Sequence, residues 1–213
     1  MKKDLTELVF ILDRSGSMRG LEKETIMGFN SMIEKQKSEE GKALVTTILF
    51  DHEIEVIHER KSIDEIRKMT DEDYYVRGYT ALLDAIGYGI EHVEIAHSHE
   101  EDRLPDKTLF VIITDGEENS SSRFTPERIR KMIKEQKRKK WEILFIGANI
   151  DAEKEAGKIG IEKDHAVDYI ADREGTELNY KALGSAISGF RNGSALPSSW
   201  KNEIMTDTKR RKH

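Results

Sequence analysis

Short apolar runs alternate along this chain with longer charged stretches. Four of the runs carry apolar, often β-branched side chains at successive positions, which is typical of central strands in a parallel sheet covered on both faces. They occupy residues 8–12, 44–50, 109–114 and 143–146. A weaker run at residues 166–170 predicts an edge strand. Residues 50–53 predict a hairpin turn into an antiparallel edge strand, because apolar residues return at 54, 56 and 57.

The charged stretches carry apolar residues at helical spacing. Alternation of such helices with buried strands predicts a doubly wound, mostly parallel α/β sheet with helices on both faces. The pattern ends near Ala195. We therefore expect one domain over residues 1–193 and a polar, basic, disordered tail over residues 194–213. The apolar stripes of the four main helices are Leu21, Ile26, Phe29, Met32 and Ile33; Leu82, Ala85, Ile86, Ile90 and Val93; Ile129, Met132 and Ile133; and Leu178, Leu183, Ala186, Ile187 and Phe190.

Composition excludes several classes of protein. The 213 residues include 35 Lys and Arg against 41 Asp and Glu, a net charge of -6 that argues against nucleic-acid binding. No apolar run approaches the roughly 20 residues of a membrane span. Cysteine is absent, so disulfides, a thiolate nucleophile and Cys-ligated zinc are excluded. No signal-peptide pattern follows Met1, and we expect a cytoplasmic protein that is a monomer on its own.

Oxygen-bearing side chains gather where the apolar runs end. Asp13, Ser15 and Ser17 follow the first run, Asp115 follows the run at 109–114, and Thr80 precedes a helix that starts near residue 81. In open α/β sheets, ligands bind beyond the carboxyl ends of the strands, so these side chains should meet. Carboxylates and hydroxyls without imidazole or sulfur suit a hard cation such as Mg²⁺.

Each of these features also has a simpler interpretation. A Ser or Asp after a strand is commonly only a helix N-cap, and an Asp-Gly pair such as Asp115-Gly116 is commonly only a turn. Three such features, each at the end of a predicted strand or start of a predicted helix, favour a common site over three unrelated turns. The metal interpretation therefore depends on the combination.

The combination resembles the metal-ion-dependent adhesion site of von Willebrand factor A-type domains, with Asp13-x-Ser15-x-Ser17, Thr80 and Thr114-Asp115-Gly116 as its motifs. The likeness spans about residues 5–191. It implies strand order 3-2-1-4-5-6 with strand 3 antiparallel. It also implies a divalent cation, Mg²⁺ or alternatively Mn²⁺ or Ca²⁺, held by these hydroxyls and carboxylates. Tyr79 stands where many members carry a small residue, and the lack of Cys is similar to intracellular bacterial members.

The resemblance implies a protein-binding module whose cation bridges to an Asp or Glu carboxylate of a partner. Analogy with intracellular members further implies work in an assembly, such as one containing an AAA-type ATPase. Two alternatives stay open. One is a metal-dependent phosphoester hydrolase with Glu117 or Glu118 as its base, and the other is a scaffold in which the metal is only structural.

The loops around the predicted site are acidic and aromatic. We expect Glu117, Glu118 and the acidic residues 71–73 to surround the cation. Tyr74 and Tyr75 either form an exposed rim that contacts the partner or pack beneath the loop that leads to Thr80.

Overall fold

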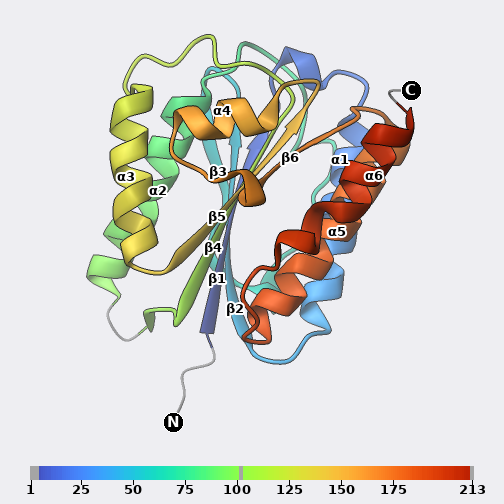
Figure 1. Cartoon of the computed structure of the whole chain (residues 1–213). Coiled ribbons are helices and arrows are strands. Elements are labelled where there is room, and N and C mark those ends of the chain that lie inside the picture. Colours follow the sequence, from blue (N-terminus) through green and yellow to red (C-terminus); the bar gives the residue numbers. More distant parts are fainter. Residues whose placement is uncertain (1–4, 101–102, 212–213) are drawn as a thin grey trace.

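The protein is described by a computed structural model covering residues 5–100 and 103–211 (Figure 1). Six strands form one sheet in the order β3-β2-β1-β4-β5-β6, and only the β2–β3 pair is antiparallel. The expected doubly wound sheet, its strand order and its antiparallel strand are confirmed. The strands are β1 (Leu5–Asp13), β2 (Lys42–Phe50), β3 (Ile54–Ser62), β4 (Lys107–Thr114), β5 (Trp141–Ala148) and β6 (Ala166–Tyr169).

Helices cover both faces of the sheet, as the apolar stripes predict. Side chains of β1 alternate between the two cores: Leu8 and Phe10 face α1 and α5, whereas Val9 and Ile11 face α2 and α3. Figure 1 shows α1, α5 and α6 on one side of the sheet and α2 and α3 on the other. The helices are α1 (Glu22–Lys37), α2 (Leu82–His99), α3 (Pro126–Arg138), α4 (Ala152–Lys158), α5 (Arg173–Arg191) and α6 (Asn202–Arg211).

The expectation of a disordered tail is wrong for the segment after Pro197. A 3₁₀ turn, η5 (Ser198–Lys201), leads into α6, and these elements bury Trp200 and Ile204 against α5 and the β6 edge. The Lys201 ammonium donates to the carbonyl of Ala166 at 2.7 Å. Two apolar anchors and such polar contacts hold a segment whose overall composition is polar. Residues 212 and 213 lie outside the described part of the chain.

The basic end of α6 contributes a second kind of contact. Arg211 donates to the carboxylate of Asp172 at 2.6 Å, and Asp172 caps the N-terminus of α5. Arg210 pairs with Glu174 in the first turn of α5. Complementary charges at these helix ends therefore favour the packing of α6 on α5. These same basic residues fall in the segment for which the sequence pattern predicts a disordered tail.

Parallel pairing brings the carboxyl ends of β1 and β4 to the same edge of the sheet. Leu12 pairs with Ile113, so the segments that follow them leave the sheet side by side. β2 pairs with β1 up to Phe50 and places Asp51 at this edge as well. The edge lies at the top of Figure 1, together with the loop that leads into α2.

Candidate metal centre

Three hydroxyls and a carboxylate form one continuous chain at this edge of the sheet. Thr80 Oγ1 donates to Ser15 Oγ at 2.9 Å, Ser15 Oγ lies 3.0 Å from Ser17 Oγ, and Ser17 Oγ donates to Asp115 Oδ1 at 2.5 Å. These groups come from the loop after β1, the start of α2 and the end of β4. Four of the five sequence-predicted site residues are therefore linked directly.

Asp13, the fifth predicted residue, is held by its own surroundings. Its Oδ1 accepts a hydrogen bond from the Ser15 amide at 2.7 Å, and its Oδ2 accepts one from Thr114 Oγ1 at 2.6 Å. The phenol of Tyr74 donates to the Asp13 carbonyl at 2.5 Å. Thr114 and Tyr74 thus orient Asp13, a role that the sequence pattern did not reveal.

Burial sets the charge state of the two carboxylates, Asp13 and Asp115. Burial raises the pKa of Asp13, in spite of the hydrogen bonds from Thr114 and Ser15. Burial also raises the pKa of Asp115 to about 6 against the hydrogen bond from Ser17, and the charge of Asp13 adds to the rise. Within the described residues, neither carboxylate forms an ion pair with a basic side chain. A positive charge between Asp13 and Asp115 would offset the cost of burying their two negative charges.

The space beside these oxygens is kept open by a glycine. A Cβ at Gly116 would lie 2.9 Å from Thr80 Oγ1 and 3.1 Å from Ser17 Oγ. Both hydroxyls thus border the volume that a side chain at position 116 would occupy. An all-oxygen donor set, two uncompensated carboxylates and this opening together fit a hard divalent cation.

A neighbouring acidic cluster has a different character. Ligand atoms of Asp51, His52 and Glu53 all lie within 4.8 Å of one another. However, Asp51 Oδ2 accepts hydrogen bonds from Arg14 Nε at 3.0 Å and Arg77 Nε at 2.9 Å. The protein's own guanidinium groups thus supply the positive charge there, and we assign no metal to this cluster.

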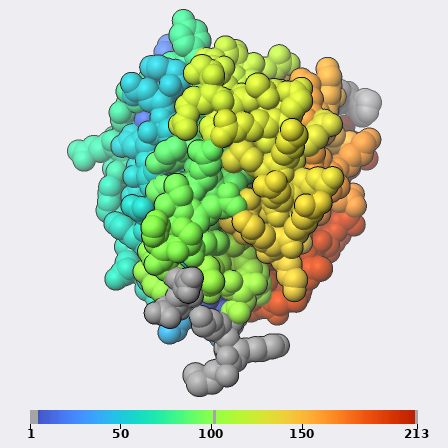
Figure 2. All heavy atoms as spheres, turned by 90° about the vertical axis from the view of Figure 1, so that its left-hand side faces the viewer, coloured from blue at the N-terminus to red at the C-terminus, as the bar shows by residue number. Residues whose placement is uncertain are grey.

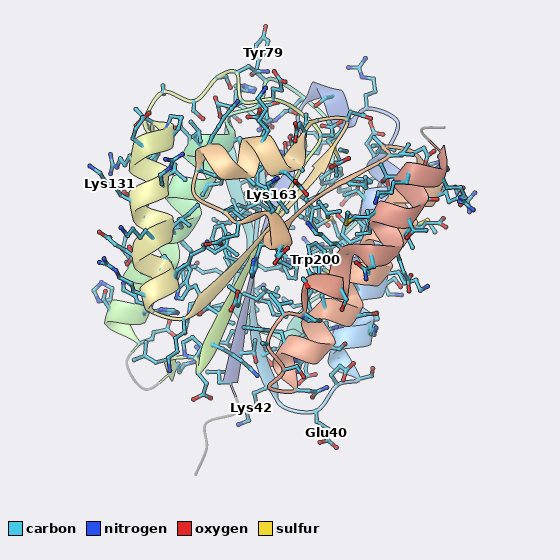
Figure 3. The ribbon with its side chains drawn as sticks, in the orientation of Figure 1. Glu40, Lys42, Tyr79, Lys131, Lys163 and Trp200 are labelled. Carbon is cyan, nitrogen blue, oxygen red and sulfur yellow. The ribbon has the colours of Figure 1, made fainter. Side chains whose placement is uncertain are left out.

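The two adjacent tyrosines have different positions. Tyr74 is buried beneath the loop, whereas Tyr75 is 44% exposed and lies between two arginines, with its ring centroid 5.2 Å from Arg14 Cζ and 5.6 Å from Arg77 Cζ. Tyr79 is 70% exposed and projects away from the molecule at the top of Figure 3. Its bulk therefore leaves the neighbouring Thr80 hydroxyl in its hydrogen bond with Ser15.

The expected ring of free acidic groups is smaller than the sequence suggests. Asp73 pairs with Arg67, and this hydrogen bond is the main reason that its pKa is lowered to about 2. Glu118 accepts hydrogen bonds from the amides of Leu83, Ser120 and Ser121. Glu117 is exposed to solvent. Glu118 is thus tied into the loop instead of projecting over the site.

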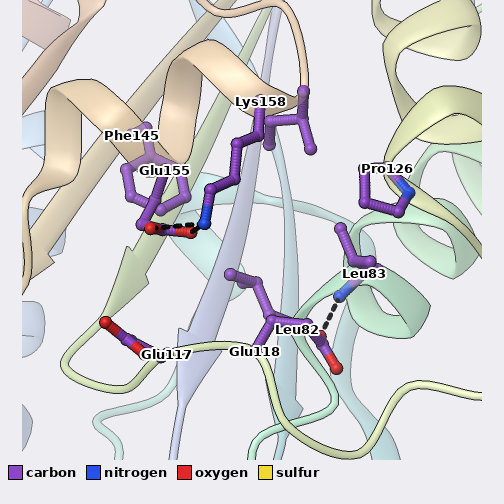
Figure 4. Close-up of a pocket in the computed structure, with 9 residues that line it drawn as sticks. Leu82, Leu83, Glu117, Glu118, Pro126, Phe145, Glu155 and Lys158 are labelled. Atoms are coloured by element: carbon purple, nitrogen blue, oxygen red, sulfur yellow. Dashed lines mark hydrogen bonds and ion pairs between the residues drawn. The ribbon is translucent and has the colours of Figure 1, made fainter.

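A pocket of about 180 Å³ lies beside this loop, between α2 and α4 (Figure 4). Leu82 and Phe145 contribute apolar surface, Glu117 and Glu118 contribute acidic groups, and an ion pair of Glu155 with Lys158, 2.7 Å long, lines another wall. Figure 4 shows the Glu118 carboxylate turned to the Leu83 amide. The pocket is therefore lined by a carboxylate that is already engaged in hydrogen bonds.

Comparison with known proteins gives a family match and a group of solved structures with the same fold. The family model for the von Willebrand factor type A domain matches residues 7–180. No curated protein matches the chain. In the described part of the chain, no helix is long and apolar enough to cross a membrane.

Three of the similar structures illustrate the range. Proximal thread matrix protein 1 from the mussel byssus, solved with a zinc-occupied MIDAS motif, has 12% identity and a TM-score of 0.58 over 86% of this chain and 46% of its own. The PilB minor pilin from Streptococcus sanguinis has 14% identity and a TM-score of 0.58, and the match covers 86% of this chain and 61% of the pilin. A von Willebrand factor type A protein from Catenulispora acidiphila has 16% identity and a TM-score of 0.57, and the match covers 86% of this chain and 42% of that protein. The chain therefore spans less than two thirds of each, and the likeness shows the fold.

Proposed function

The chain belongs to the von Willebrand factor type A domain family, and from this premise we propose that it is a metal-dependent protein-interaction module without enzymatic activity. One observation carries the proposal. Asp13 and Asp115 are buried side by side with three hydroxyls, and no basic side chain of the described chain neutralises them. This concentration of uncompensated charge supports a ligand of opposite charge.

Asp13, Ser15, Ser17, Thr80 and Asp115 would hold the cation. The oxygen-only set favours Mg²⁺, with Mn²⁺ or Ca²⁺ as alternatives, and a related fold carries zinc at its MIDAS motif. A bound divalent cation supplies a Lewis-acidic position that attracts an anionic oxygen. The three hydroxyls contribute no charge, so a divalent ion held by them would stay Lewis-acidic and would accept a further carboxylate oxygen at an open coordination position.

A partner carboxylate, from Asp or Glu, would complete the arrangement. Exposed Tyr75 and Tyr79 flank the loop that leads to Thr80, and tyrosine is among the residues that contribute most to protein interfaces. Because Asp73 and Glu118 are engaged within the chain, fewer free charges oppose the approach of an acidic residue. Membership of an intracellular assembly, with an AAA-type ATPase as one candidate, remains an inference from resemblance.

The hydrolase alternative needs a base beside the cation. Both oxygens of Glu118 accept hydrogen bonds, Oε1 from the loop amides of Ser120 and Ser121 and Oε2 from the Leu83 amide of α2, and these bonds fix the direction of that carboxylate. Glu117 is exposed. No described feature favours hydrolysis over binding, and we retain the interaction module as the conclusion.

The direct test is metal-dependent capture of a partner. Wild type and Asp13→Ala are immobilised and compared with Mg²⁺ and with EDTA. The proposal expects a partner that wild type retains only with Mg²⁺ and that Asp13→Ala does not retain. Changing single Asp and Glu residues of that partner to amides should then identify one dominant carboxylate. Metal-dependent hydrolysis of generic phosphoesters, lost in Asp13→Ala, would instead favour the enzyme.

A further inference from the structure

We propose that Asn119 is a positioning residue that sets the metal affinity by fixing Thr80 against Asp115. The inference rests on the proposed function and deepens it, because it identifies the part of the chain that controls the site. The segment concerned is residues 116–124, which follows β4 and is called the β4–α3 loop below. Figure 2 shows this yellow-green segment lying against the green atoms of α2.

Asn119 holds the backbone of Thr80 from both sides. The Thr80 amide donates to Asn119 Oδ1 at 2.9 Å, and the Asn119 amide donates back to the Thr80 carbonyl at 3.1 Å. The Ser120 amide adds a third bond to the same carbonyl at 3.3 Å. The backbone of a proposed ligand is thus fixed by another loop and not by its own helix.

The start of α2 explains why another loop is needed. Its N-cap position is Ala81, which has no side-chain oxygen for the free amides of the first turn. Glu118 Oε2 accepts from the Leu83 amide at 2.9 Å, and Ser121 Oγ accepts from the Asp84 amide at 3.0 Å. The β4–α3 loop therefore caps α2 from outside, and the Glu118 charge lies at the positive end of the helix.

Asp84 completes the connection in the opposite direction. Its carboxylate accepts hydrogen bonds from three backbone amides of the loop, those of Ser122, Arg123 and Phe124, each at 2.9 Å. The first turn of α2 and the β4–α3 loop are thus bound to each other by reciprocal carboxylates. A shift of one would break several bonds to the other.

This connection joins two proposed ligands that are far apart in the sequence. Asp115 directly precedes the loop, and Thr80 directly precedes Ala81, the N-cap of α2. The loop therefore fixes the separation of the Asp115 carboxylate and the Thr80 hydroxyl. Groups that orient the ligands of a metal commonly change its affinity by about 10- to 100-fold when they are removed. We expect Asn119→Ala to weaken Mg²⁺ and Mn²⁺ binding by about tenfold.

The test measures affinity for the metal alone in a set of matched variants. Asn119→Ala removes the acceptor for the Thr80 amide, and Asn119→Asp keeps it. Because Asp also adds a charge, Ser122→Asp provides the charge control and Ser122→Ala the neutral control, on an exposed residue of the same loop. Mn²⁺ and Mg²⁺ are titrated calorimetrically at a temperature well below every metal-free melting temperature. Hydrogen exchange at the Thr80 amide reports whether its bond is lost.

The expected result is weaker binding in Asn119→Ala together with faster exchange at Thr80. Asn119→Asp should retain more affinity than Asn119→Ala, and Ser122→Ala should match wild type. Equal affinity of Asn119→Ala and wild type would overturn this inference alone. Equal weakening in Asn119→Ala and Ser122→Ala would also overturn it, because the loop and not Asn119 would then matter. Failure of wild type to bind either metal would instead overturn the proposed function.

Discussion

Three neighbouring strands lead to a buried aspartate at the same edge of the sheet, yet the aspartates have opposite surroundings. Asp51, after β2, is 0% exposed, Asp13, at the end of β1, is 1% exposed, and Asp115, after β4, is 5% exposed. Arg14 and Arg77 both donate to Asp51. Asp13 and Asp115 instead accept hydrogen bonds from hydroxyls and amides.

The pKa directions follow from this difference. Burial alone would raise all three pKa values, and at Asp51 the Glu53 amide and the two arginines outweigh it, so its pKa is lowered. At Asp13 and Asp115 burial prevails and the pKa is raised. Burial is thus a poor guide to function here. The informative property is whether the chain itself supplies the positive charge.

Removing the charge of Asp51 should have the largest effect on folding. Asp51→Asn removes one of the two carboxylates that pair with the buried Arg14 and leaves Glu55, so the loss should approach but not exceed the about 3–5 kcal/mol that breaking a buried pair typically costs. Urea denaturation should show this loss in EDTA and in Mg²⁺ alike. A loss that disappears with added Mg²⁺ would mean that Asp51 belongs to the metal site after all.

Asp13→Asn should have the opposite effect on the metal-free protein. It removes an uncompensated buried charge, so stability in EDTA should stay unchanged or rise. Wild type should gain about 2.7 kcal/mol when Mg²⁺ is present at about 100 times its dissociation constant, and the variant should lose this gain. Thermal melting with and without Mg²⁺ measures both the stability in EDTA and the gain from the metal. A variant that is destabilised in EDTA and keeps its metal-induced shift would contradict the comparison.

The pH dependence of the metal-free protein should separate the two regions further. Because the folded-state pKa of Asp115 is raised to about 6, folding favours its protonated form, and stability should increase as pH falls from about 6 towards 4. The lowered pKa of Asp51 acts in the other direction, with stability lost only as pH falls below its ordinary value of 3.8.

Urea denaturation of metal-free wild type and Asp115→Asn between pH 7 and 4 isolates the Asp115 contribution. The difference in stability between the two proteins should be constant above about pH 6 and change as the pH falls from about 6 towards 4. Parallel curves over this whole range would show that Asp115 titrates normally.

The smallest expected effect concerns the hydroxyl of Thr80. Thr80→Ser keeps the oxygen that contacts Ser15, and Thr80→Ala removes it. Metal affinity should fall less in the serine variant than in the alanine variant. Equal losses in both would indicate that the shape of the threonine side chain, and not its oxygen, is what the site requires.

Periodicity and strand ends made much of this arrangement predictable. Continuous apolar runs identified the buried strands, and the residues directly after them include Asp13 and Asp115, which the fold brings to one edge. The sequence could not distinguish Asp51 from these two, because its arginine partners come from other loops. The predicted position of Glu118 beside the cation was wrong for the same reason, because one of its hydrogen bonds comes from an amide of α2.

The tail shows a different limit of sequence reasoning. Average polarity suggested disorder, but Trp200 and Ile204 anchor α6 to α5 and the sheet edge, together with polar contacts from other elements. Two apolar residues do not produce a recognisable stripe over so short a segment. Their value depends on an apolar surface that forms only when the rest of the chain has folded.

Direct titration of Mn²⁺ and Mg²⁺ into the wild-type protein at pH 7 tests the central claim, with Asp13→Asn and Asp115→Asn as matched variants that keep the side-chain shape. We expect one cation per wild-type chain and little or no binding by either variant, because each removes one of the two buried charges that attract the ion. Absence of binding by wild type, or binding by both variants as strong as that of wild type, would contradict it.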